Sequence, residues 1–494
     1  MSNLSKTDNY DVVIVGMGPT GLVLANLLGL EKLNVLVIDK FLSPYDLPRA
    51  VHLDDEIMRI LQVIGVASEM EKIMRPNLGM RFVDADNNLL LDWPRPQEIG
   101  KNGWKPSYKF HQPDLERVLY KNLKKFPNVE IRKGFEATEV KNEDEKVEVT
   151  ILKLEKNDAC RVKCDFIVGC DGARSFIRKK MGVEYEEMGF FEDWLVVDII
   201  LKKDRSDLGL FSIQFCGTSQ PATYSPGTRG RLRWEFALKD QKSHEDILKT
   251  DYVWNLLSRW ITPDEAKIER KAIYTFKSSL AEHWVKDRLI LAGDSAHLTP
   301  PFMGQGMCIG LRDVSNLAWK LISVIRGQSD LSFLKSYEIE RRPHAKEYIS
   351  TAIKLGKMLG ELSSNSKKSK EGPIHMKSLA PKIGNAFSIK EEEFARSLSL
   401  QPKLSNGQYV DDIVGYKFCL FLSEDLASQF SGNNSNIIVF NSKDHPTIKE
   451  YLENLSTKAL LIRPDKYILG GAKNLTELNE LLSLEFINSI NNKI

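Results

Sequence analysis

The chain has 494 residues, of which 42% are hydrophobic and 28% charged, and it is long enough for two or three domains with separate cores. Its 69 lysines and arginines nearly balance 67 aspartates and glutamates, so neither nucleic acid nor an anionic membrane is an expected partner. No secretory signal and no apolar run of about 18 residues is visible, and we expect a cytoplasmic protein.

Six cysteines are too few for a disulfide framework in a chain of this length, and we interpret them as reduced thiols. The spacing of Cys160 and Cys164 could suit a metal ion, but no second Cys/His pair accompanies it. We therefore expect two ordinary strand residues and no metal site.

A strand–helix–strand unit opens the chain. The apolar run 11–15 predicts a buried strand, residues 22–30 predict a helix, and residues 35–38 predict a second strand. Such a unit is typical of the start of a parallel sheet.

The first turn of this unit carries Gly16, Gly18 and Gly21 in the pattern Gly-x-Gly-x-x-Gly. In such a motif the first glycine permits a tight turn, the second admits a pyrophosphate, and the third lets the helix pack on the strand. Asp39 lies 18 residues after Gly21, at the end of the second strand, where a carboxylate can hold a ribose hydroxyl. This context favours dinucleotide binding over a purely structural turn.

Further along the chain, residues 162–169 and 288–292 predict two more buried strands. Between them, residues 194–201 and 231–238 alternate apolar and polar positions, which predicts an antiparallel sheet with one face on a pocket. Apolar residues at helical spacing then predict a long amphipathic helix over 307–325.

Two more motifs follow predicted strands. Residues 170–175 read Cys-Asp-Gly-Ala-Arg-Ser, which a common Asp-Gly turn could also explain. Residues 292–297 read Ala-Gly-Asp-Ser-Ala-His and lead into 300–307, Pro-Pro-Phe-Met-Gly-Gln-Gly-Met. Two prolines and two glycines ahead of a long helix predict a rigid loop whose amides face a ligand.

The C-terminal part differs in composition. Residues 362–374 are polar and small, as in a linker or surface loop. Beyond about residue 400, strand-like segments at 417–422, 436–440 and 459–463 predict a small separate α/β domain.

The three motifs, in this order and at these separations, resemble the flavoprotein aromatic hydroxylases, which are single-component group A monooxygenases. Residues 48–56, 194–199, 233–236 and 316–321 resemble the 3-(3-hydroxyphenyl)propionate hydroxylase branch of that family. The resemblance covers roughly residues 10–350. It implies a mixed α/β and α+β fold, in which a Rossmann-like FAD-binding domain holds an inserted antiparallel-sheet substrate domain and is followed by a thioredoxin-like module.

We expect the FAD-binding domain in two parts, at 8–185 and, with the long helix, at 281–360. The substrate sheet would span 186–280, a linker and helical region 361–400, and the thioredoxin-like module 401–494.

Residues 459–467 resemble the end of the thioredoxin-like module in this family. A working thioredoxin needs a Cys-x-x-Cys pair, and Cys419 stands alone. We therefore expect a structural module, with the interface of a homodimer as one role.

The resemblance also implies the cofactor contacts. It assigns FAD contacts to Gly16, Gly18, Gly21, Asp39, Lys40, Arg49, Gln112, Asp171, Arg233, Asp294, Pro301, Gly304, Gln305, Gly306 and Met307. Asp171 would also serve the transient nicotinamide nucleotide, and Asp294 would bind the ribityl chain or the adjoining phosphate. The backbone amides of 304–307 would face the flavin ring and stabilise its anionic reduced form.

Two positions depart from the family pattern. Cys308 stands where Asn is common, which puts a side-chain contact with the flavin in doubt. His52 stands where Gly is frequent, and it could act as a base on a phenol, bind a carboxylate, or have a packing role.

Three other residues are weaker candidates. Tyr224 is a candidate substrate contact because it lies in a segment that bounds the predicted antiparallel sheet. We expect His297 to be structural and Glu235 to form an ion pair with a nearby arginine.

The activity implied by the resemblance is hydroxylation of a phenol. NADH or NADPH would bind transiently and reduce FAD, and O₂ would then give a C4a-hydroperoxide that attacks a ring carbon ortho to the hydroxyl. No second Gly-x-Gly-x-x-Gly unit marks a permanent nicotinamide site. The alternatives are a hydroxylase of larger polycyclic or polyketide-like phenols, an oxidase that inserts no oxygen, and a non-enzymatic protein that interacts through its C-terminal module.

Overall fold

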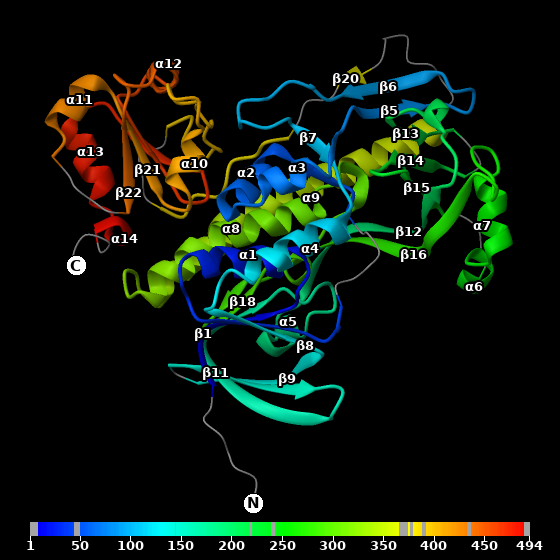
Figure 1. Ribbon diagram of the computed structural model, residues 1–494, viewed down its shortest axis with the longest axis horizontal. Helices are drawn as coiled ribbons and strands as arrows, with labels where there is room; N and C mark the ends of the chain where they lie inside the picture. The colour runs from blue at the N-terminus through cyan, green and yellow to red at the C-terminus, as the bar shows by residue number, and fades with distance from the viewer. Residues whose placement is uncertain are drawn as a thin grey trace, which may run out of the picture.

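The computed structural model describes residues 8–43, 50–143, 145–217, 220–238, 243–364, 374–375, 379–387, 392–431 and 436–488. In these ranges no helix is long and apolar enough to cross a membrane. None of the six cysteines forms a disulfide. Figure 1 shows a large body crossed by two long helices, with a smaller C-terminal body beside one end of them.

The first sheet grows from the predicted strand–helix–strand unit. Its strands in the described part of the chain are β1 (Asp8–Val15), β2 (Val35–Asp39), β8 (Val129–Lys133), β9 (Phe135–Asn142), β10 (Val147–Lys153), β11 (Asp158–Gly169), β17 (Val285–Lys286) and β18 (Leu289–Leu291). The run β18-β11-β1-β2-β8 is parallel throughout, whereas β9, β10 and β17 pair antiparallel at its margins. The predicted parallel sheet is therefore present.

Helices cover this sheet, which explains why its central strands are apolar throughout. Val12, Val13 and Ile14 of β1 are fully buried, as in a parallel strand covered on both faces. Helix α1 (Pro19–Leu30) packs against α4 (Gln112–Leu123) and against the long helix α8 (Gly306–Ile325). Helix α8 is the one predicted at 307–325.

The second sheet is the predicted antiparallel one, but it is larger than expected. Its order is β19-β16-β12-β15-β14-β13-β5-β6-β20. The strands are β5 (Gly79–Val83), β6 (Leu89–Pro94), β12 (Tyr185–Leu201), β13 (Ser212–Phe215), β14 (Ala222–Pro226), β15 (Arg231–Ala237), β16 (Ala266–Ala281), β19 (His297–Leu298) and β20 (Ile374–His375). Strands β5 and β6 come from the segment predicted as FAD-binding, and β5 joins through a parallel pairing with β13.

A small third sheet lies between these two. It consists of β3 (His52–Asp54), β7 (Ser107–Lys109) and β4 (Arg75–Pro76), with β7 in the middle. Helices α2 (Asp55–Ile64) and α3 (Ala67–Glu71) follow β3. This sheet brings the segment after Arg49 next to the segment before Gln112.

The C-terminal body is a four-stranded sheet with helices. Its elements are α10 (Val410–Val414), β21 (Phe418–Leu422), α11 (Glu424–Gln429), β22 (Ile437–Asn441), α12 (Pro446–Asn454), β23 (Ala459–Ile462), β24 (Ile468–Ala472), α13 (Leu475–Leu482) and α14 (Glu485–Asn488). The strand order is β22-β21-β23-β24, with β21 and β22 parallel and the other pairs antiparallel. The predicted α/β module is present, and its relation to thioredoxin stays a prediction.

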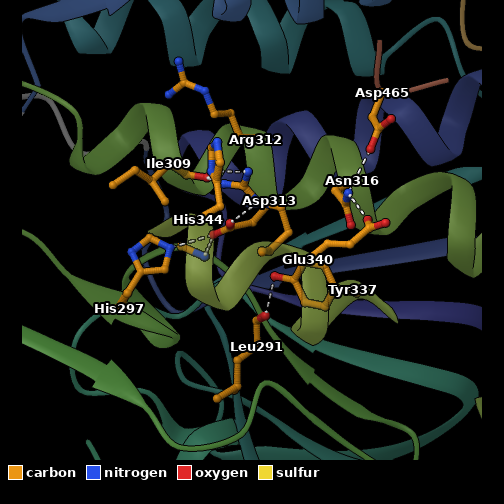
Figure 2. A network of polar contacts seen from close by, with 12 residues as sticks. Leu291, His297, Ile309, Arg312, Asp313, Asn316, Tyr337, Glu340, His344 and Asp465 are labelled. Atoms are coloured by element: carbon orange, nitrogen blue, oxygen red, sulfur yellow. Dashed lines mark hydrogen bonds and ion pairs between the residues drawn. The ribbon is translucent and has the colours of Figure 1, made fainter. Parts of the chain in front are cut away.

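A buried set of charges joins this module to α8 and to the next long helix, α9 (Lys335–Ser364). Glu340 accepts from Arg463 Nη1 at 2.5 Å and from Lys320 Nζ at 2.7 Å, and Arg463 also pairs with Asp465. Asn316 donates to both carboxylates at 2.8 Å, as Figure 2 shows. We call Lys320, Glu340, Arg463 and Asp465 the docking cluster. Their side chains are at most 2% exposed.

Two further contacts reach from the module to α2. Arg59 pairs with Asp411 at 2.7 Å, and Tyr467 donates to Glu56 Oε1 at 2.9 Å. Glu56 Oε2 in turn accepts from Arg312 of α8 at 2.5 Å. The module thus completes polar contacts that begin in α2 and α8.

Candidate functional site

The turn between β1 and α1 has the geometry of a pyrophosphate site. Gly16 has φ +108°, and a Cβ on it would overlap the Cys170 carbonyl, just as one on Gly21 would overlap the Gly16 carbonyl. A Cβ on Gly18 would meet no heavy atom within 4 Å. Two glycines close the turn and the third leaves open space before α1, whose first amides have no side-chain cap.

Asp39 stands at the edge of this turn. Its carboxylate accepts from the N–H of Met17 at 2.7 Å and from that of Phe41 at 2.8 Å. It is only half-buried, which leaves the group accessible from the side of the turn. Lys40, the next residue, is exposed, with its ammonium 5.5 Å from the centre of the Phe41 ring.

Gln112 fixes the segment that precedes β3. Its Oε1 accepts from the Ala50 N–H at 2.8 Å, and its Nε2 donates to Glu116 at 2.7 Å. The side chain therefore holds the chain directly after Arg49. Arg49 itself lies outside the described residues.

Asp171 follows β11 and begins the second motif. Its Oδ2 accepts from the N–H of Phe176 at 2.7 Å and of Ile177 at 3.2 Å, both in α5 (Phe176–Met181). Burial raises the pKa of this carboxyl, against the lowering effect of these hydrogen bonds. Its Oδ1 is buried and finds no hydrogen-bond donor in the described part of the chain. An acceptor without a donor suits a ligand hydroxyl or amide.

The third motif rests on α8. Asp294 is exposed in a short 3₁₀ turn, Gly293–Ser295. Beneath it Asp313 accepts from the Gly293 N–H at 3.2 Å, from His297 Nε2 at 2.6 Å and from Arg341 Nε at 3.0 Å. Figure 2 shows Asp313 next to His297. His297 is buried and hydrogen-bonded to Asp313, an arrangement that agrees with the structural role predicted for it.

The loop before α8 carries the residues expected at the flavin ring. Pro301 opens a 3₁₀ turn that ends at Gly304, whose φ is +63°. Gln305 is buried, and its Nε2 donates to Asp54 at 3.1 Å. Gly306 and Met307 form the first turn of α8, where backbone amides are free to face a ligand.

Cys308, the departure from the family pattern, points inward. Its Sγ lies 3.8 Å from the His52 carbonyl oxygen and 3.9 Å from that of Gly304. Burial holds the pKa of the thiol well above its usual range. Cys308 is therefore a neutral side chain that bonds to backbone.

The face of the second sheet that carries Arg233 is charged. Arg233 Nε donates to Asp198 at 2.6 Å, and Asp198 also accepts from Arg270 at 2.9 Å. Arg233 Nη1 lies 3.7 Å from Glu235, which confirms the predicted ion pair. Burial raises the pKa of Glu235, with the charge of Arg233 opposing it.

Tyr224 lies on the opposite face. Its ring is 4.9 Å from that of Trp234, and its hydroxyl donates to the Gly209 carbonyl at 3.2 Å. Both rings belong to a core that includes residues of α6 (His244–Ile247) and α7 (Thr250–Leu257). The structure therefore does not bring Tyr224 together with Arg233, because neighbouring strand positions alternate between faces.

Two basic residues beside this face were not predicted from the sequence as site residues. Lys109 of β7 is 5% exposed and donates to Ser225 Oγ of β14 at 2.8 Å. Arg75 of β4 donates to the carbonyls of Gly227 and Pro226 at 2.7 and 2.6 Å. For Lys109, the available sequence signal was its position between two aromatic residues, Tyr108 and Phe110, which are both buried.

Comparison with known proteins agrees with this geometry. A family model described as an FAD binding domain matches residues 9–352. A probable NADH-specific resorcinol 4-hydroxylase of Rhodococcus jostii (strain RHA1) is 40% identical over 352 residues. That match covers 70% of this chain and 65% of the relative.

A 3-(3-hydroxy-phenyl)propionate/3-hydroxycinnamic acid hydroxylase of Mycolicibacterium gilvum (strain PYR-GCK) is 34% identical over 384 residues, which cover 77% of this chain and 65% of the relative. The chain thus spans just under two thirds of the length of these two relatives.

Solved structures share the fold over nearly the whole chain. The rebeccamycin biosynthetic enzyme RebC with reduced flavin aligns with a TM-score of 0.79 at 18% identity, covering 98% of this chain and 100% of that one. The flavin-dependent monooxygenase PieE in complex with FAD and substrate aligns with a TM-score of 0.80 at 16% identity, covering 98% and 99%. At these identities the likeness concerns the fold alone.

The residues present fit FAD. The space at Gly18, the uncapped amides of α1, the Asp39 carboxylate and the unpaired oxygen of Asp171 are the donors and acceptors that a dinucleotide needs. They lie within the matched range of 9–352. The chain therefore belongs to the FAD-binding-domain family.

Proposed function

We propose that this protein is an FAD-dependent monooxygenase that hydroxylates a phenol ortho to its hydroxyl, with NADH as reductant and O₂ as oxygen source. One contact carries the proposal. His52 Nδ1 lies 3.2 Å from the carbonyl of Gly304, in the loop expected at the flavin ring. On the neighbouring strand Lys109 reaches the charged face of the second sheet. The flavin loop and the sheet face are thus adjacent.

We assign the following roles to the cofactor residues. Gly16, Gly18 and Gly21 bind the pyrophosphate, while Asp39 and Lys40 lie beside the adenosine ribose. Gln112 contacts FAD from the start of α4, Asp171 and Asp294 contact it from the second and third motifs, and the contact predicted for Arg49 is kept. Pro301 and 304–307 face the ring, and Arg233 approaches from the second sheet. A bound FAD would supply the redox chemistry, namely hydride acceptance from NADH and activation of O₂.

The protein itself supplies charge, orientation and a dry site. The first amides of α8 carry partial positive charge, which stabilises negative charge on a nearby ring. The second sheet orients the phenol, and the buried side chain of Gln305 helps to keep water away from the reacting atoms.

The named substrates of the two relatives support the substrate class. Resorcinol and 3-(3-hydroxyphenyl)propionate are both phenols with a second substituent meta to the hydroxyl. Position 4 of resorcinol is ortho to one hydroxyl and para to the other, so hydroxylation there is compatible with ortho attack. A phenol with a single ring is therefore the first class to test.

The test uses the FAD-loaded full chain with NADH, O₂ and a panel of phenol, resorcinol and 3-(3-hydroxyphenyl)propionate. We expect at least one phenol to accelerate NADH oxidation and to give one hydroxylated product per NADH, with label from ¹⁸O₂ in the product. Peroxide in equal amount to NADH, without a hydroxylated product, would instead identify an oxidase. NADPH in place of NADH tests the choice of reductant.

A further inference from the structure

Three basic side chains form a row across the small third sheet. In the register of β3, β7 and β4, His52 is opposite Lys109, and Lys109 is opposite Arg75. Residues directly opposite each other in antiparallel strands project from the same face. Lys109 and Arg75 both bond to β14 or the turn after it, and His52 bonds to Gly304. The row therefore lies between the flavin loop and the charged face.

Lys109 has no carboxylate partner among the described residues. Its ammonium bonds to the neutral Ser225 hydroxyl, and it makes no ion pair in the described part of the chain. The charged side chains that act on it are Arg75, Arg95, Arg233 and Glu235. We call these four residues and Lys109 the cationic cluster.

The other charges near the cationic cluster are already engaged. Asp198 is shared by Arg233 and Arg270, and Asp54 accepts from Arg312 at 2.5 Å. Asp55, with burial and Asp54 raising its pKa to about 6, accepts from Asn102. Of the four charges that act on Lys109, three are therefore cations and one, Glu235, is an anion.

This imbalance changes the protonation of Lys109. Burial lowers the pKa of Lys109 to about 7, and the charge of Arg75 lowers it further against the opposing charge of Glu235. A buried ammonium without an anion is costly, so the neutral amine is well populated near neutral pH. An amine of this kind can accept a proton under the conditions in which an enzyme works.

His52 does not have this freedom. Its Nδ1 donates to the Gly304 carbonyl at 3.2 Å, and its Nε2 lies 2.8 Å from Ser107 Oγ. Asn77 donates to the same Ser107 oxygen at 3.0 Å, so the serine hydroxyl donates to His52. Burial, opposed by Asp54, lowers the pKa of His52 to about 4. Both ring nitrogens are used, and His52 positions the flavin loop.

We propose that Lys109 is the residue that accepts the phenolic proton of the substrate, with Arg75 and Arg233 stabilising the resulting phenolate. The inference rests on the proposed function. The phenolic O–H bond breaks, an N–H bond forms on Lys109 Nζ, and the electron pair stays on oxygen. No redox partner is required for this step. The phenolate raises the electron density of the ortho carbon, and the proton returns to oxygen before the product leaves.

The first experiment measures ionisation of a bound phenol. FAD-loaded protein is titrated with 4-nitrophenol, whose phenolate absorbs visible light, at a pH where the free compound is mostly protonated. We expect the phenolate band to appear with wild type and to be absent with Lys109→Met. The matched control is Lys105→Met, because Lys105 lies shortly before β7 and its Nζ donates to the Gln97 carbonyl instead. Equal bands in wild type and Lys109→Met overturn the proposal.

The second experiment measures turnover against pH. We expect kcat/KM of wild type to rise through an apparent pKa near 7 and Lys109→Met to lose about 10²- to 10⁴-fold, the usual contribution of a general base. Lys109→Arg keeps the charge but cannot release its proton, so it should bind the phenolate yet lack this pH limb. An unchanged pH limb in Lys109→Arg overturns the proposal, even where Lys109→Met fails to bind FAD.

These outcomes separate the proposal from the function on which it rests. Wild type that hydroxylates no phenol contradicts the proposed function, and the 4-nitrophenol titration still decides for or against Lys109. Wild type that hydroxylates resorcinol, with Lys109→Met active within tenfold, contradicts the role of Lys109 alone.

Discussion

The docking cluster is buried throughout and the cationic cluster is buried at Lys109 and Arg233, but only the first has equal numbers of cations and anions. In the docking cluster two cations, Lys320 and Arg463, meet two anions, Glu340 and Asp465, at hydrogen-bond distances. Burial alone would raise the pKa of Glu340, yet Arg463 and Lys320 outweigh it and bring the pKa to about 2. In the cationic cluster Lys109 donates to one hydroxyl, and the charges that act on it are three arginines and one glutamate, Glu235.

This difference separates two uses of buried charge. A balanced set of buried charges can hold two bodies together. The large loss of stability comes when one partner is removed, because the remaining charge is then buried without compensation. An unbalanced set of buried cations destabilises the free protein, and binding of an anion relieves this cost. Such groups have perturbed pKa values, which cluster at functional sites. The substitutions below test each half of the comparison.

The largest effect is expected for Glu340→Gln. The change leaves Lys320 and Arg463 with Asp465 as their remaining anion in the docking cluster, and it should lower the free energy of unfolding by about 3–5 kcal/mol. Urea unfolding measures it. Glu347→Gln, at an exposed position of the same helix, should stay within about 0.5 kcal/mol of wild type. A loss of less than about 1 kcal/mol for Glu340→Gln would show that the cluster does not hold the module.

The next effect has the opposite sign. Lys109→Met should raise the free energy of unfolding at pH 7 by about 1–3 kcal/mol, because it removes a buried ammonium without a carboxylate. Between the folded pKa of about 7 and the ordinary value of 10.5, the unfolded chain binds more protons, so wild-type stability rises with pH. The advantage of Lys109→Met should therefore be full below about pH 7 and vanish near about 10.5. A pH-independent difference would contradict the uncompensated charge.

A smaller effect is expected for His52→Gln. This substitution tests whether His52, beside the cationic cluster, also acts as a base. Because the pKa of His52 is about 4, its titration lies below the working range of pH. We expect kcat to fall less than about tenfold through a displaced flavin loop, with an unchanged pH profile. Loss of the limb near pH 7 in steady-state kinetics would assign the base to His52 instead.

The smallest effect is expected for Tyr224→Phe, on the uncharged face of the same sheet. It removes the hydrogen bond to Gly209 and should cost about 1 kcal/mol of unfolding free energy. KM for the phenol should not change, since the ring packs on Trp234 away from Arg233. A tenfold rise in KM in steady-state assays would return Tyr224 to the substrate site.

The parts of the fold that depend on local pattern were predictable. Strand β1 was predicted from the apolar run that ends before Gly16, and β2 from the apolar run that ends before Asp39. Both signals lie in the strand itself. The loop at 304–307 was likewise visible from its glycines and the helix that follows. Such signals lie within a few residues of one another.

Contacts between distant segments left no such signal. The parallel pairing of β5 with β13 joins residues about 130 positions apart, and nothing in either strand names its partner. In the sequence, Lys320 and Glu340 have the pattern of exposed charges on two helices. In the structure they bond to each other, and Arg463 of the C-terminal module bonds to Glu340. Lys109 could be recognised only once Ser225 and Arg75 were placed beside it. The balance of buried charge depends on which distant segments the fold brings together, and local sequence does not reveal it.

The shared carboxylate of Glu56 has a consequence for biosynthesis. One of its oxygens is held by Arg312 below the flavin loop, and the other by Tyr467, which is synthesised 411 residues later. While the ribosome is still translating the middle of the chain, Glu56 lacks this second donor, as Arg59 lacks Asp411. The nascent FAD-binding half therefore reaches its final polar arrangement only after residue 467 has left the exit tunnel.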